Sequence, residues 1–219
     1  MFRSVRVIGR GRAGGAIAAR LEERGLLSPH DDADLVVLCV PDTAIAGVAS
    51  ALPPGPWVAH VSGATQLEAL EPHRARFSVH PLQTLTRDRG AEQLDGAWAA
   101  VSGESDLARD AGRWLARTLG LRAFELDDER RAIYHAGAVI ASNYLVTIQR
   151  AAARAMVAAG APPEALVPLM QRTIDNGFQL TGPIARGDWA TVEAHLAALR
   201  RDLPDLEVLY RALALATRP

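Results

Sequence analysis

A glycine-rich turn near the first residue constrains the fold of this chain more than any other feature. Residues 5–8 form a β-rich run, and Gly9, Gly11 and Gly14 follow it with the spacing GxGxxG. A preceding strand and a following helix are the context in which this motif binds a dinucleotide. There the first glycine permits a tight turn, the second lets the backbone approach a pyrophosphate, and the third lets helix and strand pack closely. The motif therefore predicts a strand–turn–helix unit of a dinucleotide-binding domain.

Neighbours of the glycines extend this candidate site. The helix expected after the loop offers free backbone N–H groups and a partial positive charge, and Arg10 and Arg12 add cations. The residues predicted to bind the cofactor are Gly9, Arg10, Gly11, Arg12, Ala13, Gly14, Val40, Pro41, Asp42, Ser62 and Gly63. The alternative is a glycine-rich turn that binds no ligand.

Short apolar runs alternate with helical patterns over the first 126 residues. Strands are expected near 35–40, 57–61, 77–80, 98–102 and 121–126, and helices over 14–24 and 106–119. This alternation favours right-handed crossovers and a doubly wound, mainly parallel sheet. Helices are then expected over about 127–159, 163–180, 188–201 and 204–217. The sequence thus predicts an α/β sheet domain, residues 1–126, followed by an all-helical domain, residues 127–219.

The second strand of the predicted sheet is truncated. Only residues 26–34 separate Gly25 from the apolar run that begins at Leu35. In a complete dinucleotide-binding fold the second strand ends in the residue that contacts the adenosine ribose, about 20 positions beyond the glycines. We therefore expect a strand stub around Leu26 and Leu27, and weakened binding of the adenosine end. The usual rule then does not choose between NAD and NADP.

Polar side chains follow several of the apolar runs, where doubly wound sheets bind their ligands. His80 lies between such a run and a proline, and an imidazole there suits proton transfer near neutral pH. In the long helix, His135, Val139 and Asn143 are spaced i, i+4, i+8 and should share one face. The predicted catalytic residues are His80, Ser62, His135 and Asn143. The alternatives are a His80 that bonds only backbone and a polar network inside the core.

The composition excludes several other kinds of site. All 24 basic residues are arginine, which rules out a phosphate-binding or Schiff-base lysine. Cys39 is the only cysteine, so neither a disulfide framework nor a cysteine-based zinc cluster is possible, and no metal site is predicted. The net charge of −1 argues against nucleic acid as a partner. No apolar run approaches the ~20 residues that span a bilayer, and a cytoplasmic location is expected.

Six segments together carry a resemblance to a known family: GRGRAGGAIA (9–18), ADLVVLCVPDTAI (33–45), HVSGA (60–64), HPLQT (80–84), YHAGAVIASNYL (134–145) and LTGPIARGD (180–188). The chain resembles Rossmann-like, NADP-oxidoreductase-like proteins with a C-terminal helical domain of unknown function. Their architecture is similar to pyrroline-5-carboxylate reductase and prephenate dehydrogenase, with a 6-phosphogluconate dehydrogenase C-terminal-like helical part.

The resemblance implies a nicotinamide cofactor on the glycine loop and a substrate between the sheet edge and the helices of a dimer. It places His80 where prephenate dehydrogenase has its catalytic histidine, Ser62 as a nearby substrate contact, and Ser142 and Asn143 over the nicotinamide. Hydroxyacid-dehydrogenase relatives use a lysine on that helix. This chain has Val139 and no lysine, so that chemistry is not carried over.

The function predicted from the sequence is an NAD(P)-dependent oxidoreductase acting on a small, anionic metabolite. The alternative is a non-catalytic, dimeric module that binds a nucleotide or another anion. A homodimer through the helical domain is expected, because alanine-rich helices alone would make a thin core and a second copy would help to bury them.

Overall fold

The computed structural model describes residues 1–217. The chain divides into two compact units, Met1–Ile140 and Ala141–Pro219, which are described separately below. The last strand ends at Glu125, next to the predicted boundary at 126/127. The boundary between the two compact units nevertheless lies later, after Ile140. The reason is that the start of the first long helix packs against the sheet, where Arg131 is buried and bonds the backbone of Ser62.

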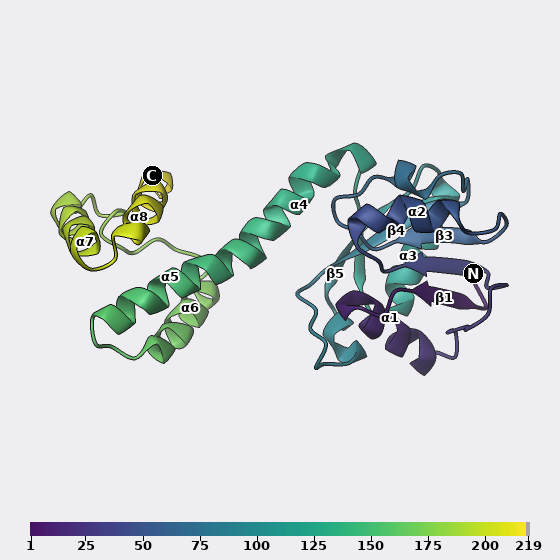
Figure 1. Ribbon diagram of the computed structural model, residues 1–219, viewed down its shortest axis with the longest axis horizontal. Helices are drawn as coiled ribbons and strands as arrows, with labels where there is room; N and C mark the ends of the chain where they lie inside the picture. The colour runs from purple at the N-terminus through teal and green to yellow at the C-terminus, as the bar shows by residue number, and fades with distance from the viewer. Residues whose placement is uncertain (218–219) are drawn as a thin grey trace. The chain divides into compact units, whose positions relative to one another are not determined.

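The first unit contains a six-stranded sheet with strands in sequence order (Figure 1). The strands are β1 (Val5–Ile8), β2 (Leu35–Leu38), β3 (Trp57–His60), β4 (Arg76–Leu82), β5 (Trp98–Ser102) and β6 (Arg122–Glu125). All neighbouring pairs are parallel except β4 and β5, which are antiparallel. The predicted stub is confirmed: Leu27 forms a single parallel bridge with Val5 on the side of β1 away from β2.

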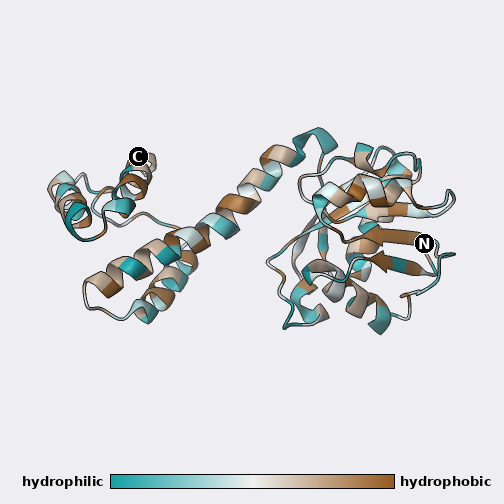
Figure 2. Ribbon diagram, in the orientation of Figure 1, coloured by the Kyte–Doolittle hydropathy of each residue, from teal (hydrophilic) through white to brown (hydrophobic). Residues whose placement is uncertain are grey.

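Helices cover both faces of this sheet. α1 (Arg12–Glu23) and α3 (Asp106–Thr118) pack on one face and share its apolar core. The short α2 (Ile45–Ser50) packs on the other face with a smaller apolar cluster. β2 is buried at every position, as expected of a strand covered on both faces, and the central strands are strongly hydrophobic (Figure 2). Short 3-10 turns span Asp42–Ala44, Leu67–Leu70, Ala91–Leu94, Asp128–Arg130 and Pro163–Ala165.

Helices make up the rest of the chain. They are α4 (Arg131–Val139), a π-helical stretch (Ile140–Tyr144), α5 (Leu145–Ala158), α6 (Leu166–Asp175), α7 (Trp189–Asp202) and α8 (Pro204–Ala216). Asp188 caps α7 by accepting a hydrogen bond from the Thr191 N–H. α6 ends earlier than predicted, because Gly177 and Phe178 take left-handed backbone conformations that no helix can continue. Within residues 1–217, no helix is both long and apolar enough to cross a membrane.

The helical unit has little core of its own. Among its described residues, the buried apolar side chains are only Val192, Leu196 and Ala214. Large apolar side chains such as Leu169 and Phe178 are instead 62% and 71% exposed. Apolar segments recur along α5 and α6 (Figure 2). This unit therefore leaves apolar surface to be covered by something else.

Candidate active site

The glycine loop connects β1 to α1 with two glycines that tolerate no side chain. Gly9 has φ +94°, and a Cβ there would lie 2.4 Å from the carbonyl oxygen of Cys39. A Cβ on Gly14 would lie 2.0 Å from the carbonyl oxygen of Gly9. The first glycine thus permits the turn, and the third brings α1 against the loop, as the motif predicts.

Gly11 differs from its two partners, because a Cβ added to it would meet nothing within 4 Å. Packing therefore does not explain this glycine, and the space beside it is open to a ligand. Gly11 is also the N-cap residue of α1, and no side chain caps the helix. The first N–H groups of a helix have no partners within it, so those of Arg12 and Ala13 are available to an anion.

The loop lies at the point where the sheet changes direction. The chain passes from β1 to the stub on one side and then to β2 on the other, and ligands of doubly wound sheets bind at such a switch point. After β2, Cys39 lies beneath the loop, and burial raises the pKa of its thiol to about 12. Val40 approaches Gly9 from the same strand end. The open glycine, the uncapped helix and the switch point together fit the pyrophosphate of a dinucleotide.

A second group of polar residues surrounds His80 in β4. Nδ1 of His80 lies 2.7 Å from the Tyr134 hydroxyl of α4, and the ring of His135 lies 6.0 Å from that of His80. Burial raises the pKa of Tyr134 to about 12, so its hydroxyl keeps its proton at neutral pH. His80 therefore bonds a side chain and not only backbone.

The pKa of His80 departs from the expectation of a group that titrates near pH 7. Burial first, and then the charges of His135 and Arg131, lower it to about 4, against a smaller opposing effect of Asp42. His80 is consequently a neutral imidazole at physiological pH. In that form it serves as a hydrogen-bond donor or acceptor, not as a charged acid.

The rings of His80 and His135 both lie close to the backbone of Gly63, which follows β3. A Cβ on Gly63 would lie 2.7 Å from Cδ2 of His135 and 2.9 Å from Nε2 of His80. Only a glycine allows both rings to approach the backbone so closely. The structure thus brings together Gly63, His80 and His135, which the sequence predicted as site residues from three separate segments.

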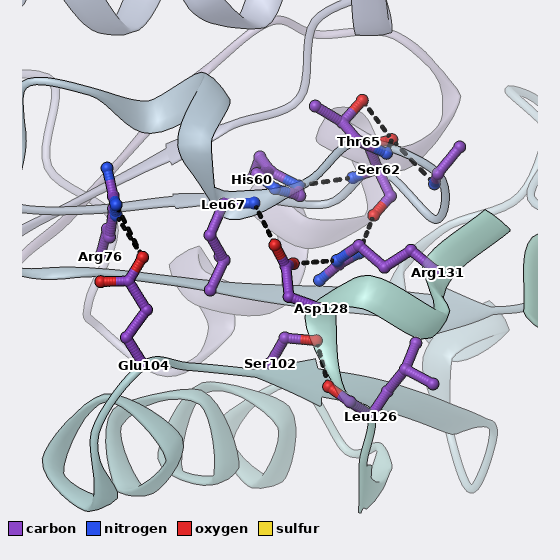
Figure 3. Close-up of polar contacts among 11 residues, drawn as sticks. His60, Ser62, Thr65, Leu67, Arg76, Ser102, Glu104, Leu126, Asp128 and Arg131 are labelled. Atoms are coloured by element: carbon purple, nitrogen blue, oxygen red, sulfur yellow. Dashed lines mark hydrogen bonds and ion pairs between the residues drawn. The ribbon is translucent and has the colours of Figure 1, made fainter.

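Ser62 serves the local backbone. Its hydroxyl donates to Oγ1 of Thr65 at 2.9 Å and accepts from the N–H groups of Ala64 and Thr65. These contacts form a tight turn after β3 (Figure 3). They leave the Ser62 hydroxyl little capacity for the substrate contact expected of it.

A buried arginine, which the sequence did not predict as a site residue, stabilises this turn. Arg131 is 1% exposed; its Nη1 donates to the Ser62 carbonyl oxygen at 2.9 Å, and its Nε donates to Asp128 Oδ1 at 2.6 Å (Figure 3). The other Asp128 oxygen accepts from the Leu67 N–H. In the sequence Asp128 reads as a helix cap and Arg131 as one of a run of surface charges, so no local signal reveals the pair.

His60, the last residue of β3, lies in the core. His60 is fully buried, its Nδ1 accepts from the Ser62 N–H, and burial lowers its pKa to about 3. It is a core histidine. Across residues 1–217, no group of three or more histidine, cysteine or acidic side chains is arranged to hold a metal ion.

Asn143 lies in the π-helical stretch Ile140–Tyr144. It belongs to the second unit, where the Ser142 hydroxyl lies 3.2 Å from its side-chain oxygen. Between Val139 and Asn143 the helix is π-helical over Ile140–Tyr144, and the common face of His135, Val139 and Asn143 stays a prediction. The role of Asn143 stays a prediction.

The mainly parallel sheet, the glycine loop at its first strand and the helices that follow define the class: this is a Rossmann-like protein with a C-terminal helical region. More narrowly, the chain belongs to the family described as Domain of unknown function (DUF2520), whose model matches residues 97–217, more than half of its length. None of the curated proteins matches the sequence.

Solved structures share the fold over nearly the whole chain. A Bacteroides fragilis protein described as a "putative NADP oxidoreductase" matches with TM-score 0.80 and 20% identity, over 98% of this chain and 97% of that chain. Protein TM1727 from Thermotoga maritima matches with TM-score 0.78 and 24% identity, over 97% and 96%. Plasmodium falciparum pyrroline carboxylate reductase with NADP bound matches with TM-score 0.60 and 12% identity, over 97% and 94%. The resemblance in fold predicted from the sequence is confirmed.

Proposed function

We propose that this protein is an NAD(P)-dependent oxidoreductase acting on a small, anionic metabolite. The observation that carries the proposal is the pairing of a glycine loop open at Gly11 with a neutral His80 bonded to Tyr134. Two of the similar solved structures have NADP in their names, which supports a nicotinamide dinucleotide as the cofactor. A bound nicotinamide would supply or accept hydride, and the residues of this chain would orient the reactants and handle the proton.

In this proposal the backbone at Gly11 and the start of α1 hold the pyrophosphate. In the arrangement we propose, the Tyr134 hydroxyl donates to Nδ1 of His80, which leaves the hydrogen of the neutral imidazole on Nε2. That N–H polarises an oxygen or nitrogen of the substrate. The positive charge of Arg131 acts on His80 and would favour a substrate anion at the same place.

A binding module without catalysis is the second candidate function. The short second strand favours it, because a stub reduces the contacts available to the adenosine end. The Tyr134–His80 hydrogen bond favours the enzyme, since a module that only binds a nucleotide has no need of an imidazole oriented by a tyrosine hydroxyl. We therefore place the enzyme first.

The direct test is isothermal titration calorimetry with NADP, NADPH, NAD and NADH. We expect dissociation constants of tens of micromolar or weaker, as the loss of two or three hydrogen bonds at ~1 kcal/mol each implies. No binding of any of the four at millimolar concentration would contradict the proposal. Once a substrate is identified, His80→Asn should lower kcat by roughly 100-fold, whereas unchanged turnover would favour the binding module.

We also propose that the protein is a homodimer through its helical unit. The exposed apolar side chains of α5 and α6 and the few buried ones in that unit support this. A second copy can cover such a surface symmetrically.

A further inference from the structure

The stub beside β1 ends well before the edge of the sheet that carries the glycine loop. Its only bridge joins Leu27 to Val5, the first residue of β1, and the Ser28 N–H bonds the Val5 carbonyl oxygen. Gly9 lies four residues further along, or about 13 Å at ~3.3 Å per strand residue. No residue at the end of this stub is therefore placed to contact a ribose bound beside the loop.

The acidic residues that follow the stub lie at the opposite edge. Asp31 pairs with Arg6, and Asp34 accepts hydrogen bonds from the backbone N–H groups of Arg3 and Ser4. Asp31, Asp32 and Asp34 line a cavity together with residues that precede β1 and β3. In NAD-binding folds a carboxylate after the second strand bonds the 2′-hydroxyl of the adenosine ribose. In this chain the three carboxylates of that segment lie at the edge of the sheet opposite the glycine loop, away from where that ribose would bind.

Two arginines, not carboxylates, lie at the edge of the sheet that carries the glycine loop. Arg10 lies between Gly9 and Gly11, and Arg12 is the first residue of α1. Both are exposed, and neither has an ion-pair partner among residues 1–217. Asp42, the acid after β2, acts on His80 and so lies on the other side of β1. A guanidinium binds a phosphate with paired, charge-assisted hydrogen bonds.

From this placement we infer that the cofactor is NADP, and that Arg10 and Arg12 select it over NAD by binding the 2′-phosphate. The inference rests on the proposed function and narrows its cofactor to one form. It also explains how an adenosine site with a stub for a second strand can hold its ligand: positive charge beside the loop replaces the contacts that a complete strand would supply.

Calorimetric titration of NADP and NAD into the wild-type protein tests this inference without any substrate, since the two ligands differ only by the 2′-phosphate. The variants are Arg10→Gln, Arg12→Gln and the double variant. The control is Arg74→Gln, because Arg74 is an exposed arginine just before β4, at the opposite edge of the sheet. We expect the wild type and the control to bind NADP at least ~10-fold more tightly than NAD.

The double variant should bind the two nucleotides within about twofold of each other. Wild-type protein that binds NAD as tightly as NADP, or a double variant that keeps the preference, would overturn the inference and leave the proposed function standing. If neither nucleotide binds, the proposed function fails and the inference fails with it.

Discussion

At the scale of single residues, the half-buried His80 and the buried His60 predict how stability depends on pH. The pKa values of His80 and His60 in the folded chain, about 4 and about 3, lie below the ordinary value of 6.5. The unfolded chain therefore takes up protons first as the pH falls, and the free energy of unfolding should decrease from about pH 6.5 downwards. For His80 alone the loss by pH 4 is about 3 kcal/mol at 1.36 kcal/mol per unit.

Urea denaturation of the wild type and of His80→Asn at pH 7 and pH 4.5 measures this effect. Carboxylates contribute equally to both proteins, so the difference isolates His80. The variant should lose less stability than the wild type over this range. An equal loss in both proteins would show that His80 is not held neutral.

Arg131 gives a second prediction at this scale. Its removal leaves Asp128 without its ion-pair partner and the Ser62 carbonyl oxygen without its donor. Arg131→Met should reduce the free energy of unfolding by roughly 3 kcal/mol. Arg130→Met, the neighbouring exposed arginine, should change it by less than about 0.5 kcal/mol. Similar small effects for both variants would refute the structural role given to Arg131.

At the scale of elements, α1 offers a matched pair of glycines. A Cβ on Gly14 would collide with the Gly9 carbonyl oxygen, whereas a Cβ on Gly15 would meet nothing within 4 Å. Gly14→Ala should therefore destabilise the protein by about 3 kcal/mol or more, and Gly15→Ala should stabilise it by ~0.5–1 kcal/mol. Thermal denaturation compares the two. A Gly14→Ala protein as stable as the wild type would mean that α1 does not pack against the loop.

The elements also show what the sequence could and could not predict. The strands and the stub follow from local apolar runs, and the glycine loop is a contiguous motif, so each was predictable. The π-helical stretch at Ile140–Tyr144 was not, because nothing in an apolar helical pattern marks an inserted residue. The bond from Arg131 to Ser62 joins segments 69 positions apart, and single-sequence patterns carry no information about such contacts.

At the scale of the whole molecule, the proposed homodimer predicts the mass in solution. Light scattering at micromolar concentration should give twice the 23.4 kDa of one chain. Leu169→Glu, on the exposed apolar surface of α6, should shift the protein toward the monomer because the dimer would bury an unpaired charge. Leu107→Glu, at an exposed leucine of the sheet unit, is the control. A 23.4 kDa wild-type species would contradict the proposal.

The central claim is that the open space beside Gly11 holds the pyrophosphate of a nicotinamide dinucleotide, and one comparison tests it most directly. Gly11→Val places a side chain in that space, where Gly11 has φ −72° and no neighbour within 4 Å of its Cβ position; Gly15→Val adds the same side chain four residues on. NADPH is titrated by calorimetry into both variants and the wild type, after thermal denaturation has shown that they fold. We predict that Gly11→Val loses binding at least ~10-fold while Gly15→Val retains it. A folded Gly11→Val protein that binds NADPH as tightly as the wild type would contradict the account.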